Sequence, residues 1–251
     1  MHNGKSGKGR RRNVPNSRSS FWFVLRRLLL ALLILLAASY PAARLGLFMW
    51  PRSYDPLAVP DLGAAPGLFT GWQMKLVDLD PQNCRAAFAL AGITTTITTL
   101  PAQGACTREG LATLPRLSTA SLRPEAMRCA IAARLYLWER HVLQPAAQRL
   151  LNEPIVEILH FGSYNCRTKR GKSSLSEHAS ANAFDISGFR TKSGKVISVR
   201  RDWSARTAEG KLLHMARDGL CDWFNVTLSP DYNADHADHF HVDMGWYRTC
   251  R

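Results

Sequence analysis

The chain has 251 residues, of which 46% are hydrophobic, and it carries 33 Lys and Arg against 19 Asp and Glu, a formal net charge of +14. The first 27 residues hold eight Lys or Arg and no acidic residue, so the rest of the chain carries only +6 of this charge. The basic character therefore belongs mainly to the N-terminus, and we do not expect the globular part to bind nucleic acid. No HExxH, GxSxG or P-loop motif is present, which excludes the chemistries that those motifs carry.

An uncharged, apolar stretch runs from Leu28 to Ala43. It is shorter than the about 20 residues of a typical membrane-spanning helix, which suits the core of a signal peptide or a short anchor. Ala37-Ala38-Ser39 offers a cleavage site with small side chains, whereas apolar residues resume after Arg44, which favours retention. We therefore predict that residues 28–50 are a signal peptide or a membrane anchor, and both alternatives stay open.

Two basic residues, Arg26 and Arg27, stand directly before the apolar stretch. Positive residues remain on the cytoplasmic side, so residues 1–27 are predicted to be a basic cytoplasmic tail. The rest of the chain is then periplasmic or otherwise extracytoplasmic, and anchored to the inner membrane if the segment is retained.

All six cysteines lie after the apolar stretch, and none shows Cys-x-x-Cys spacing. Scattered cysteines in an exported domain indicate three disulfides and argue against cysteine ligands for zinc. Fifteen pairings are possible, and our choice among them is Cys84–Cys106, Cys129–Cys166 and Cys221–Cys250.

Residues 51–71 are rich in Pro, Gly and Ala, and we interpret them as a linker. Residues 72–251 are long enough for one domain with a substantial core. Its first expected elements are a helix at 81–90, a strand at 93–100 and a long helix from Ser121. Pro145 either interrupts this long helix or begins a second short helix that runs to Leu151. The remaining expected elements are a strand at 155–161, a hairpin of 184–189 with 195–199, a helix at 205–220 and a strand at 223–228. The fold class is α+β, with an antiparallel sheet that carries the site and helices on its other face.

Two segments, 176–185 and 236–243, contain four of the eight histidines together with several carboxylates. Such ligands suit zinc, and His178, Asp185 and one histidine of the second segment would form a three-ligand site. One helix would separate His178 from Asp185 by about 10 Å, so the chain must fold back between them, most simply into a strand that starts at Ala183. A structural role for the histidines is the simpler alternative.

The second segment alternates in character. His239, His241 and Asp243 are separated by Phe240 and Val242, which predicts a strand with one apolar face and one face of imidazoles and carboxylate.

Ser176, His178, Ala183, Asp185, His239 and His241 together resemble the signature of the LAS metallopeptidases, the group of lysostaphin, D-Ala-D-Ala peptidases and hedgehog. The runs at 161–167, 176–186 and 231–244 are similar to the extensin-like C-terminal domain family, and this resemblance covers about residues 80–251. It implies a zinc-peptidase-like fold.

The resemblance also implies a role for each matching residue. His178, Asp185 and His241 would bind Zn²⁺, and Asp238 would be the general base with His239 as its rival. Arg167 would polarise the scissile carbonyl. The sequence departs from the pattern at Ala181, where the group has glycine, and at Asp238, where it has the longer glutamate.

Substrate-binding roles are expected for Ser176 and for His236, although His236 could instead cap a turn. The basic loop at 169–174 is either a solvated loop or a guide for carboxylate-bearing ligands.

The expected function is therefore that of an exported zinc metallopeptidase that hydrolyses amide or peptide bonds of peptidoglycan or another cell-wall polymer. The alternative is a non-catalytic module that binds the wall, or that keeps the metal for structure.

Overall fold

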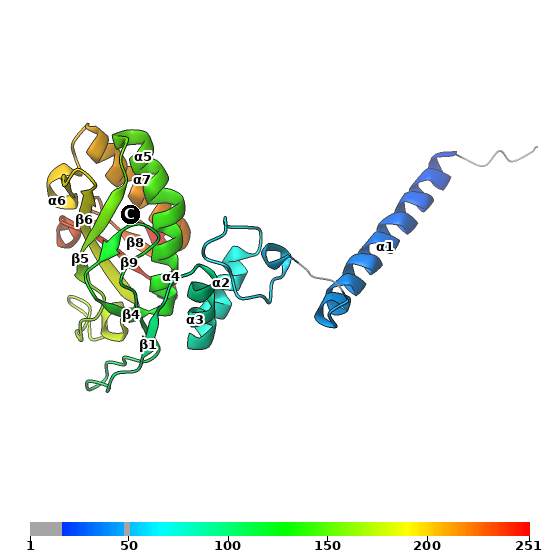
Figure 1. Cartoon of the computed structure of the whole chain (residues 1–251), viewed down its shortest axis with the longest axis horizontal. Coiled ribbons are helices and arrows are strands. Elements are labelled where there is room, and N and C mark those ends of the chain that lie inside the picture. Colours follow the sequence, from blue (N-terminus) through cyan, green and yellow to red (C-terminus); the bar gives the residue numbers. More distant parts are fainter. Residues whose placement is uncertain (1–16, 48–50) are drawn as a thin grey trace, which may run out of the picture. The chain divides into compact units, whose positions relative to one another are not determined.

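The computed structural model describes residues 17–47 and 51–251, and it divides the chain into two compact units, residues 1–51 and 52–251 (Figure 1). Residues 1–16 of the predicted tail and 48–50 of the predicted anchor lie outside the described residues. Each unit is considered by itself.

The described part of the first unit forms the helix α1 (Ser17–Arg44), which starts before the predicted anchor and includes Arg26 and Arg27. Its stretch Phe21–Arg44 is apolar enough to cross a membrane, and at 1.5 Å per residue it spans about 36 Å, more than the about 30 Å of a hydrocarbon core. Gly46 ends the helix with φ 77°, the left-handed conformation that glycine adopts without strain. The helix is compatible with a signal sequence or an anchor.

The second unit is built on a seven-stranded sheet with the order β10-β8-β9-β6-β5-β3, and with β7 paired to β6. Its strands are β3 (Ser121–Leu122), β5 (Ile155–Gly162), β6 (Ala183–Thr191), β7 (Val196–Ser198), β8 (Val226–Leu228), β9 (Phe240–Asp243) and β10 (Thr249–Cys250). The predicted hairpin of β6 with β7 is confirmed. The sheet is antiparallel in its centre, but β3 and β10 pair in parallel with their neighbours, so the prediction of an antiparallel sheet is wrong at both edges. Neither edge strand is joined to its neighbour by a hairpin. The longer connections, from β3 to β5 and from β8 to β10, allow the two strands to run parallel.

A second sheet joins β1 (Thr96–Thr98), β2 (Leu111–Thr113) and β4 (Ala126–Arg128). The sequence does not predict this sheet, because its local pattern places 121–128 at the start of the longest helix. The pairing of β4 with β2 buries Met127 as a strand residue, and this tertiary pairing outweighs the local helical pattern.

The helices of the second unit are α2 (Thr70–Leu79), α3 (Pro81–Leu90), α4 (Cys129–Trp138), the π-helical turn η2 (Glu139–Leu143), α5 (Gln144–Leu151), α6 (Val199–Asp202) and α7 (Ala208–Trp223). The predicted helix 81–90 is confirmed, with Asp80 accepting from the Gln82 backbone N–H at its start. Pro145 does not interrupt the path from α4 to α5, because it lies in the first turn of α5, directly after the π-helical turn. The predicted helix 205–220 is observed three residues later at each end.

The helices α4, α5 and α7 lie on one face of the large sheet (Figure 1). Trp138 is fully buried, its indole N–H donates to the Ala216 carbonyl of α7 at 2.9 Å, and its ring contacts Phe189 of β6. Phe184 and Ile186 of β6 belong to the same hydrophobic core, and because side chains alternate along a strand, Asp185 between them points to the opposite face.

The Pro- and Gly-rich segment differs from a free linker. Leu62 is fully buried in the core, and the Gln73 side chain donates to the carbonyls of Arg52 and Asp55. Residues 52–71, including the short helix η1 (Arg52–Tyr54), therefore belong to the compact second unit. Burial of the few apolar residues among the prolines explains this, since composition alone does not show what they contact.

Three disulfides link all six cysteines, in the pairs Cys84–Cys129, Cys106–Cys166 and Cys221–Cys250. The predicted pair Cys221–Cys250 is confirmed, and the other two predicted pairs are wrong. The packing of α3 beside the start of α4 brings Cys84 to Cys129, and this arrangement is not encoded in the spacing. Three disulfides suggest an extracytoplasmic location.

Candidate metal centre

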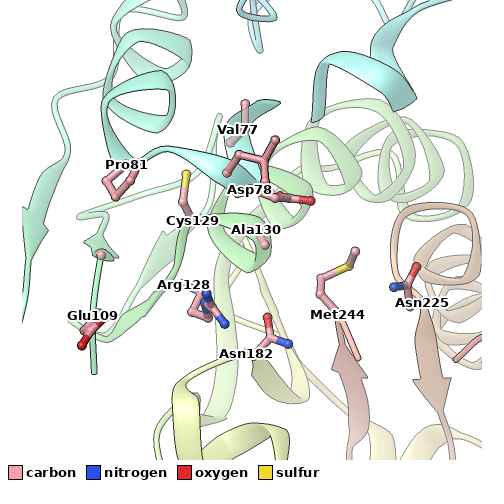
Figure 2. A pocket seen from close by; sticks show the side chains of 12 residues that line it. Val77, Asp78, Pro81, Glu109, Arg128, Cys129, Ala130, Asn182, Asn225 and Met244 are labelled. Carbon is pink, nitrogen blue, oxygen red and sulfur yellow. The ribbon is translucent and has the colours of Figure 1, made fainter. Parts of the chain in front are cut away.

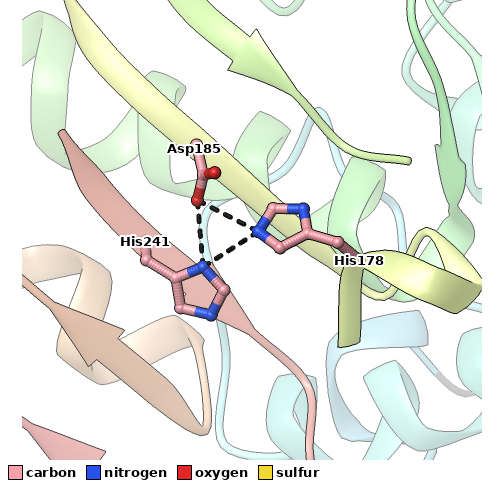
Figure 3. A group of neighbouring side chains, drawn as sticks. All are labelled: His178, Asp185 and His241. Carbon is pink, nitrogen blue, oxygen red and sulfur yellow. Dashed lines mark hydrogen bonds and ion pairs between the residues drawn. The ribbon is translucent and has the colours of Figure 1, made fainter. Parts of the chain in front are cut away.

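The face of the sheet turned away from the helices carries a cluster of His178, Asp185 and His241, called here the His/Asp/His cluster (Figure 3). Asp185 on β6 lies directly opposite His241 on β9 in the strand register, and His178 comes from the short helix η3 (Glu177–Ser180). The His178 Nε2, His241 Nδ1 and Asp185 Oδ1 atoms are 2.9–3.2 Å apart. The structure thus brings together the three residues that the motifs singled out as ligands.

A tight reversal of the chain delivers His178. Ser176 caps η3 by accepting the His178 backbone N–H, and its own N–H donates to the Arg167 carbonyl. Ala181 ends η3 with φ 52°, a left-handed conformation that costs a non-glycine residue about 1 kcal/mol or more. The chain then enters β6, as the spacing of the ligands requires. Ser176, which was expected to bind substrate, instead caps this short helix with its hydroxyl.

Two hydrogen bonds fix which ring nitrogen of each histidine faces the cluster. The His178 Nδ1–H donates to the carbonyl of Ser163 at 2.7 Å, and the His241 Nε2–H donates to Asp243 at 3.0 Å. A backbone carbonyl and a carboxylate can only accept, so these nitrogens carry the hydrogens. In the neutral rings, the nitrogens that face Asp185 therefore present lone pairs.

Three lone-pair donors consequently converge without a hydrogen between them, an arrangement that needs a cation. In the protein alone the cation is a proton. Burial by itself lowers the pKa of His241, but hydrogen bonds to Asp185 and Asp243 and their charges outweigh burial and raise the pKa to about 9. Burial favours the neutral form of Asp185, yet His178 and His241 hold its pKa well below the usual range.

The cluster fits a divalent metal by its donor chemistry and spacing. Zinc binds imidazole nitrogen and carboxylate oxygen at about 2.0–2.2 Å, and tetrahedral geometry then separates neighbouring ligand atoms by about 3.3 Å. The observed 2.9–3.2 Å is close to this value. Each histidine is held from behind by an acceptor, as metal-binding histidines commonly are.

His239 and Asp238 form a pair beside the cluster. The His239 Nδ1–H donates to Asp238 at 2.8 Å, and its Nε2 lies 3.7 Å from the Asp185 carboxylate. The carboxylate of Asp238 thereby turns the free nitrogen of His239 towards the cluster.

His236 ends the short helix η4 (Ala234–His236), where its Nδ1–H donates to Asn233, the residue that caps this helix. Its ring also lies beside the rings of His239 and His241. Burial and the positive charges of His241 and His239 lower the pKa of His236 to about 4. His236 therefore combines the capping contact with a neutral ring at the border of the cluster.

Arg167 is exposed, and its guanidinium donates to the Thr168 carbonyl at 3.4 Å. Among the described residues, this guanidinium does not contact the His/Asp/His cluster. In the basic loop, Arg170 forms an ion pair with Asp235, and Lys169 lies over the ring of Tyr247.

Three residues that support the cluster had no predicted role, namely Ser163, Glu125 and Asp243. Ser163 is fully buried, and its hydroxyl donates to the Ala183 carbonyl, which holds the loop that supports His178. Glu125 accepts the backbone N–H of Ser163 at 2.9 Å. The alternation of His241 with Asp243 was a signal for the acceptor behind His241, whereas nothing in the sequence pointed to Glu125.

A separate hollow of about 380 Å³ lies where α2 and α3 meet the starts of α4 and β6 (Figure 2). It contains none of the three cluster residues. Two of its polar side chains are already engaged, since Asn182 donates to Glu177 and Asn225 donates to the Gly245 carbonyl. We therefore locate the candidate site at the His/Asp/His cluster.

Comparison with known proteins adds a family to this geometry. The family described as Extensin-like protein C-terminus matches residues 82–251, about two thirds of the chain. The chain belongs to this family. The extensin-like region includes all residues of the His/Asp/His cluster and all six cysteines. No curated protein and no solved structure matches the chain.

Proposed function

We propose that this extensin-like protein is an exported, zinc-dependent hydrolase of amide or peptide bonds in peptidoglycan or a related cell-wall polymer. The convergence of three lone-pair donors at His178, Asp185 and His241 is the observation that supports this most. An extracytoplasmic location would bring the site to such a polymer.

When bound, a zinc ion supplies positive charge that polarises a carbonyl group and makes a water molecule more acidic. The residues around it then divide the proton transfers. Asp238 keeps Nδ1 of His239 protonated, so Nε2 is free to accept a proton from the attacking water and to return it to the leaving amine. We therefore assign proton transfer to His239 and its orientation to Asp238.

The motif resemblance to the LAS metallopeptidases supports the same class of reaction. The positions that resemble their ligands, His178, Asp185 and His241, are the ones that converge. The anchor or signal helix at the N-terminus and the three disulfides are in keeping with an envelope protein.

One observation favours the alternative of a non-catalytic wall-binding module. Arg167, which the resemblance would place on the substrate carbonyl, is exposed and contacts Thr168. Without a positive group at that position, oxyanion stabilisation falls to the metal and His239 alone.

The test measures metal content and hydrolysis together. Purified full-length protein in detergent is analysed for zinc and incubated with isolated sacculi, with and without a chelator. We expect stoichiometric zinc and release of soluble fragments only without chelator. His239→Gln should retain zinc and lose about 10²–10⁴-fold in rate, because it leaves His178, Asp185 and His241 in place and removes the group that transfers the proton.

Asp218→Asn is the matched control for carboxylate substitutions, because Asp218 is exposed on α7, away from the cluster, and pairs with its neighbour Arg217. Zinc without fragment release from the parent protein would favour the binding module. Absence of zinc would overturn the hydrolase and also a module that keeps the metal for structure.

A further inference from the structure

Four rings follow one another along one side of the His/Asp/His cluster, in the order Tyr232, His236, His239 and Phe161. Neighbouring ring centroids are 5.6, 5.2 and 5.6 Å apart. His236 also lies 5.8 Å from His241, so the series passes directly beside the cluster. We call these four residues the aromatic row.

Phe161, at one end of the row, occupies an irregular position in β5. His160 pairs with Ile186 and Gly162 pairs with Asp185, so Phe161 is the extra residue of a β-bulge. Bulges re-aim side chains and are frequent next to functional sites. The ring that this bulge presents is 60% exposed, and core packing therefore does not account for it.

The bulge is held by the same segment that supports a ligand of the cluster. Gly162 has φ 110°, a conformation that favours glycine. The Glu125 carboxylate then accepts the backbone N–H groups of Ser163 and Tyr164. Because the Ser163 carbonyl accepts from His178, the position of Phe161 is fixed relative to the cluster.

Tyr232, at the other end of the row, is 49% exposed and lies in the turn before η4. Its backbone N–H donates to the Ser229 carbonyl at 2.9 Å, which fixes the turn. Both ends of the row contact their imidazole neighbours edge to face, an arrangement that leaves much of the aromatic surface open to a ligand.

We propose that the aromatic row binds a glycan strand, with sugar rings stacked on Phe161 and Tyr232. A pyranose ring has an apolar C–H face and a polar rim, so it matches exposed aromatic rings that flank imidazole donors and acceptors. The basic loop at 169–174 is tied to the segment of the row by the ion pair of Arg170 with Asp235, the neighbour of His236, and its charge suits a glycan that carries carboxylates.

This site deepens the proposed function and rests on it, because a glycan held on the row places its attached amides at the cluster. It also identifies the substrate class as glycan-linked chains, in preference to free peptides. A free peptide would gain little from the row, which offers ring faces and not an open strand edge.

The first experiment titrates the full-length protein in detergent with a soluble β-1,4-linked tetramer of N-acetylglucosamine, using calorimetry. We expect the parent to bind, and Phe161→Ala and Tyr232→Ala each to weaken binding about tenfold through loss of stacking area. Phe161→Trp should retain binding, since it keeps a ring at the bulge. Tyr54→Ala is the matched control, because Tyr54 is 58% exposed on η1 and is not part of the row.

The second experiment repeats the titration on chelator-treated protein and with a free stem tetrapeptide as the probe. Binding of the tetramer without metal, together with loss of sacculus hydrolysis, would support the row independently of the hydrolase. Equal affinities of the parent and both alanine variants for the tetramer would overturn the proposal. So would a parent that binds the tetrapeptide but not the tetramer.

Discussion

Two carboxylates of the second unit, Glu139 in the core and Asp185 on the opposite face of the sheet, have different surroundings. Glu139 is fully buried and accepts from the backbone N–H groups of Ser118, Thr119 and Ala120 and from the Gln144 amide. The Ser118 hydroxyl donates to it as well. Asp185 instead faces two imidazole nitrogens that present lone pairs.

This difference separates a structural carboxylate from a candidate ligand. Every acceptor position of Glu139 meets a donor from the protein, so the group has nothing left to offer a ligand. With neutral imidazoles, Asp185 and its neighbours have more acceptors than hydrogens, so a proton or a metal ion would complete them. The number of hydrogen-bond donors around a carboxylate therefore indicates better than its burial whether it can bind a ligand.

The largest effect is expected for Glu139→Ala. The substitution leaves three backbone N–H groups of the loop 118–120 without their acceptor, and we expect the free energy of unfolding to fall by about 3–5 kcal/mol. Denaturant unfolding with the disulfides intact measures it. Zinc content of the folded fraction should stay at the parent level, and a loss of zinc would contradict the separation of the two carboxylates.

Asp185→Asn should mainly affect zinc binding, whereas Glu139→Ala mainly affects stability. It removes the negative ligand, so zinc affinity should fall at least about 100-fold, as judged by competition with a chromogenic chelator. The metal-free variant also loses the ion pair with protonated His241, so its free energy of unfolding should fall, but by less than the about 3–5 kcal/mol expected for Glu139→Ala. A destabilisation as large as that of Glu139→Ala would show that Asp185 is structural.

Asp243→Asn tests the acceptor behind His241. It weakens the hydrogen bond that holds Nε2 and turns Nδ1 towards the cluster, so zinc affinity should fall about 10–100-fold. The same competition assay measures it, with Asp218→Asn as the control. An unchanged affinity would mean that the strand alone orients His241.

The smallest expected effect is the release of protons when zinc binds. The metal-free protein holds a proton on His241 below its pKa of about 9, and zinc needs that nitrogen unprotonated. Zinc binding at pH 7.5 should therefore release about one proton, measured by calorimetry in buffers of different ionisation enthalpy. Because the folded pKa is raised, this group stabilises the metal-free fold fully below about pH 6.5, and the contribution is lost as the pH rises through about 9. Zinc binding without proton release would contradict the arrangement of hydrogens at the cluster.

The sequence predicted much of the local structure around the site. The Asp80-Pro81 start of α3, the hairpin of β6 with β7 and the strand at 155–161 follow from capping, turn chemistry and alternation, which act between near neighbours. The need for the chain to reverse between His178 and Asp185 also followed from spacing alone. The structure shows how the reversal is made, with Ala181 in a left-handed conformation.

Other features depended on contacts between distant segments. The strand β4 replaced the start of a predicted helix because β2 was available to pair with it. Two predicted disulfides were wrong because the packing of α3 and α4, and not the spacing of cysteines, sets which sulfur atoms meet. Residues 52–71 pack against the core because the side chain of Leu62 is buried there.

The sequence by itself determined which residue types were present for a metal centre and which elements would carry them, since motifs and periodicity are local properties. Only the tertiary structure decided the roles of Ser163, Asp243 and Glu125, the bulge that exposes Phe161, and the direction in which Arg167 points. The physical reason is that hydrogen-bond partners and strand register are set by which segments meet, and the meeting of segments is a property of the whole fold.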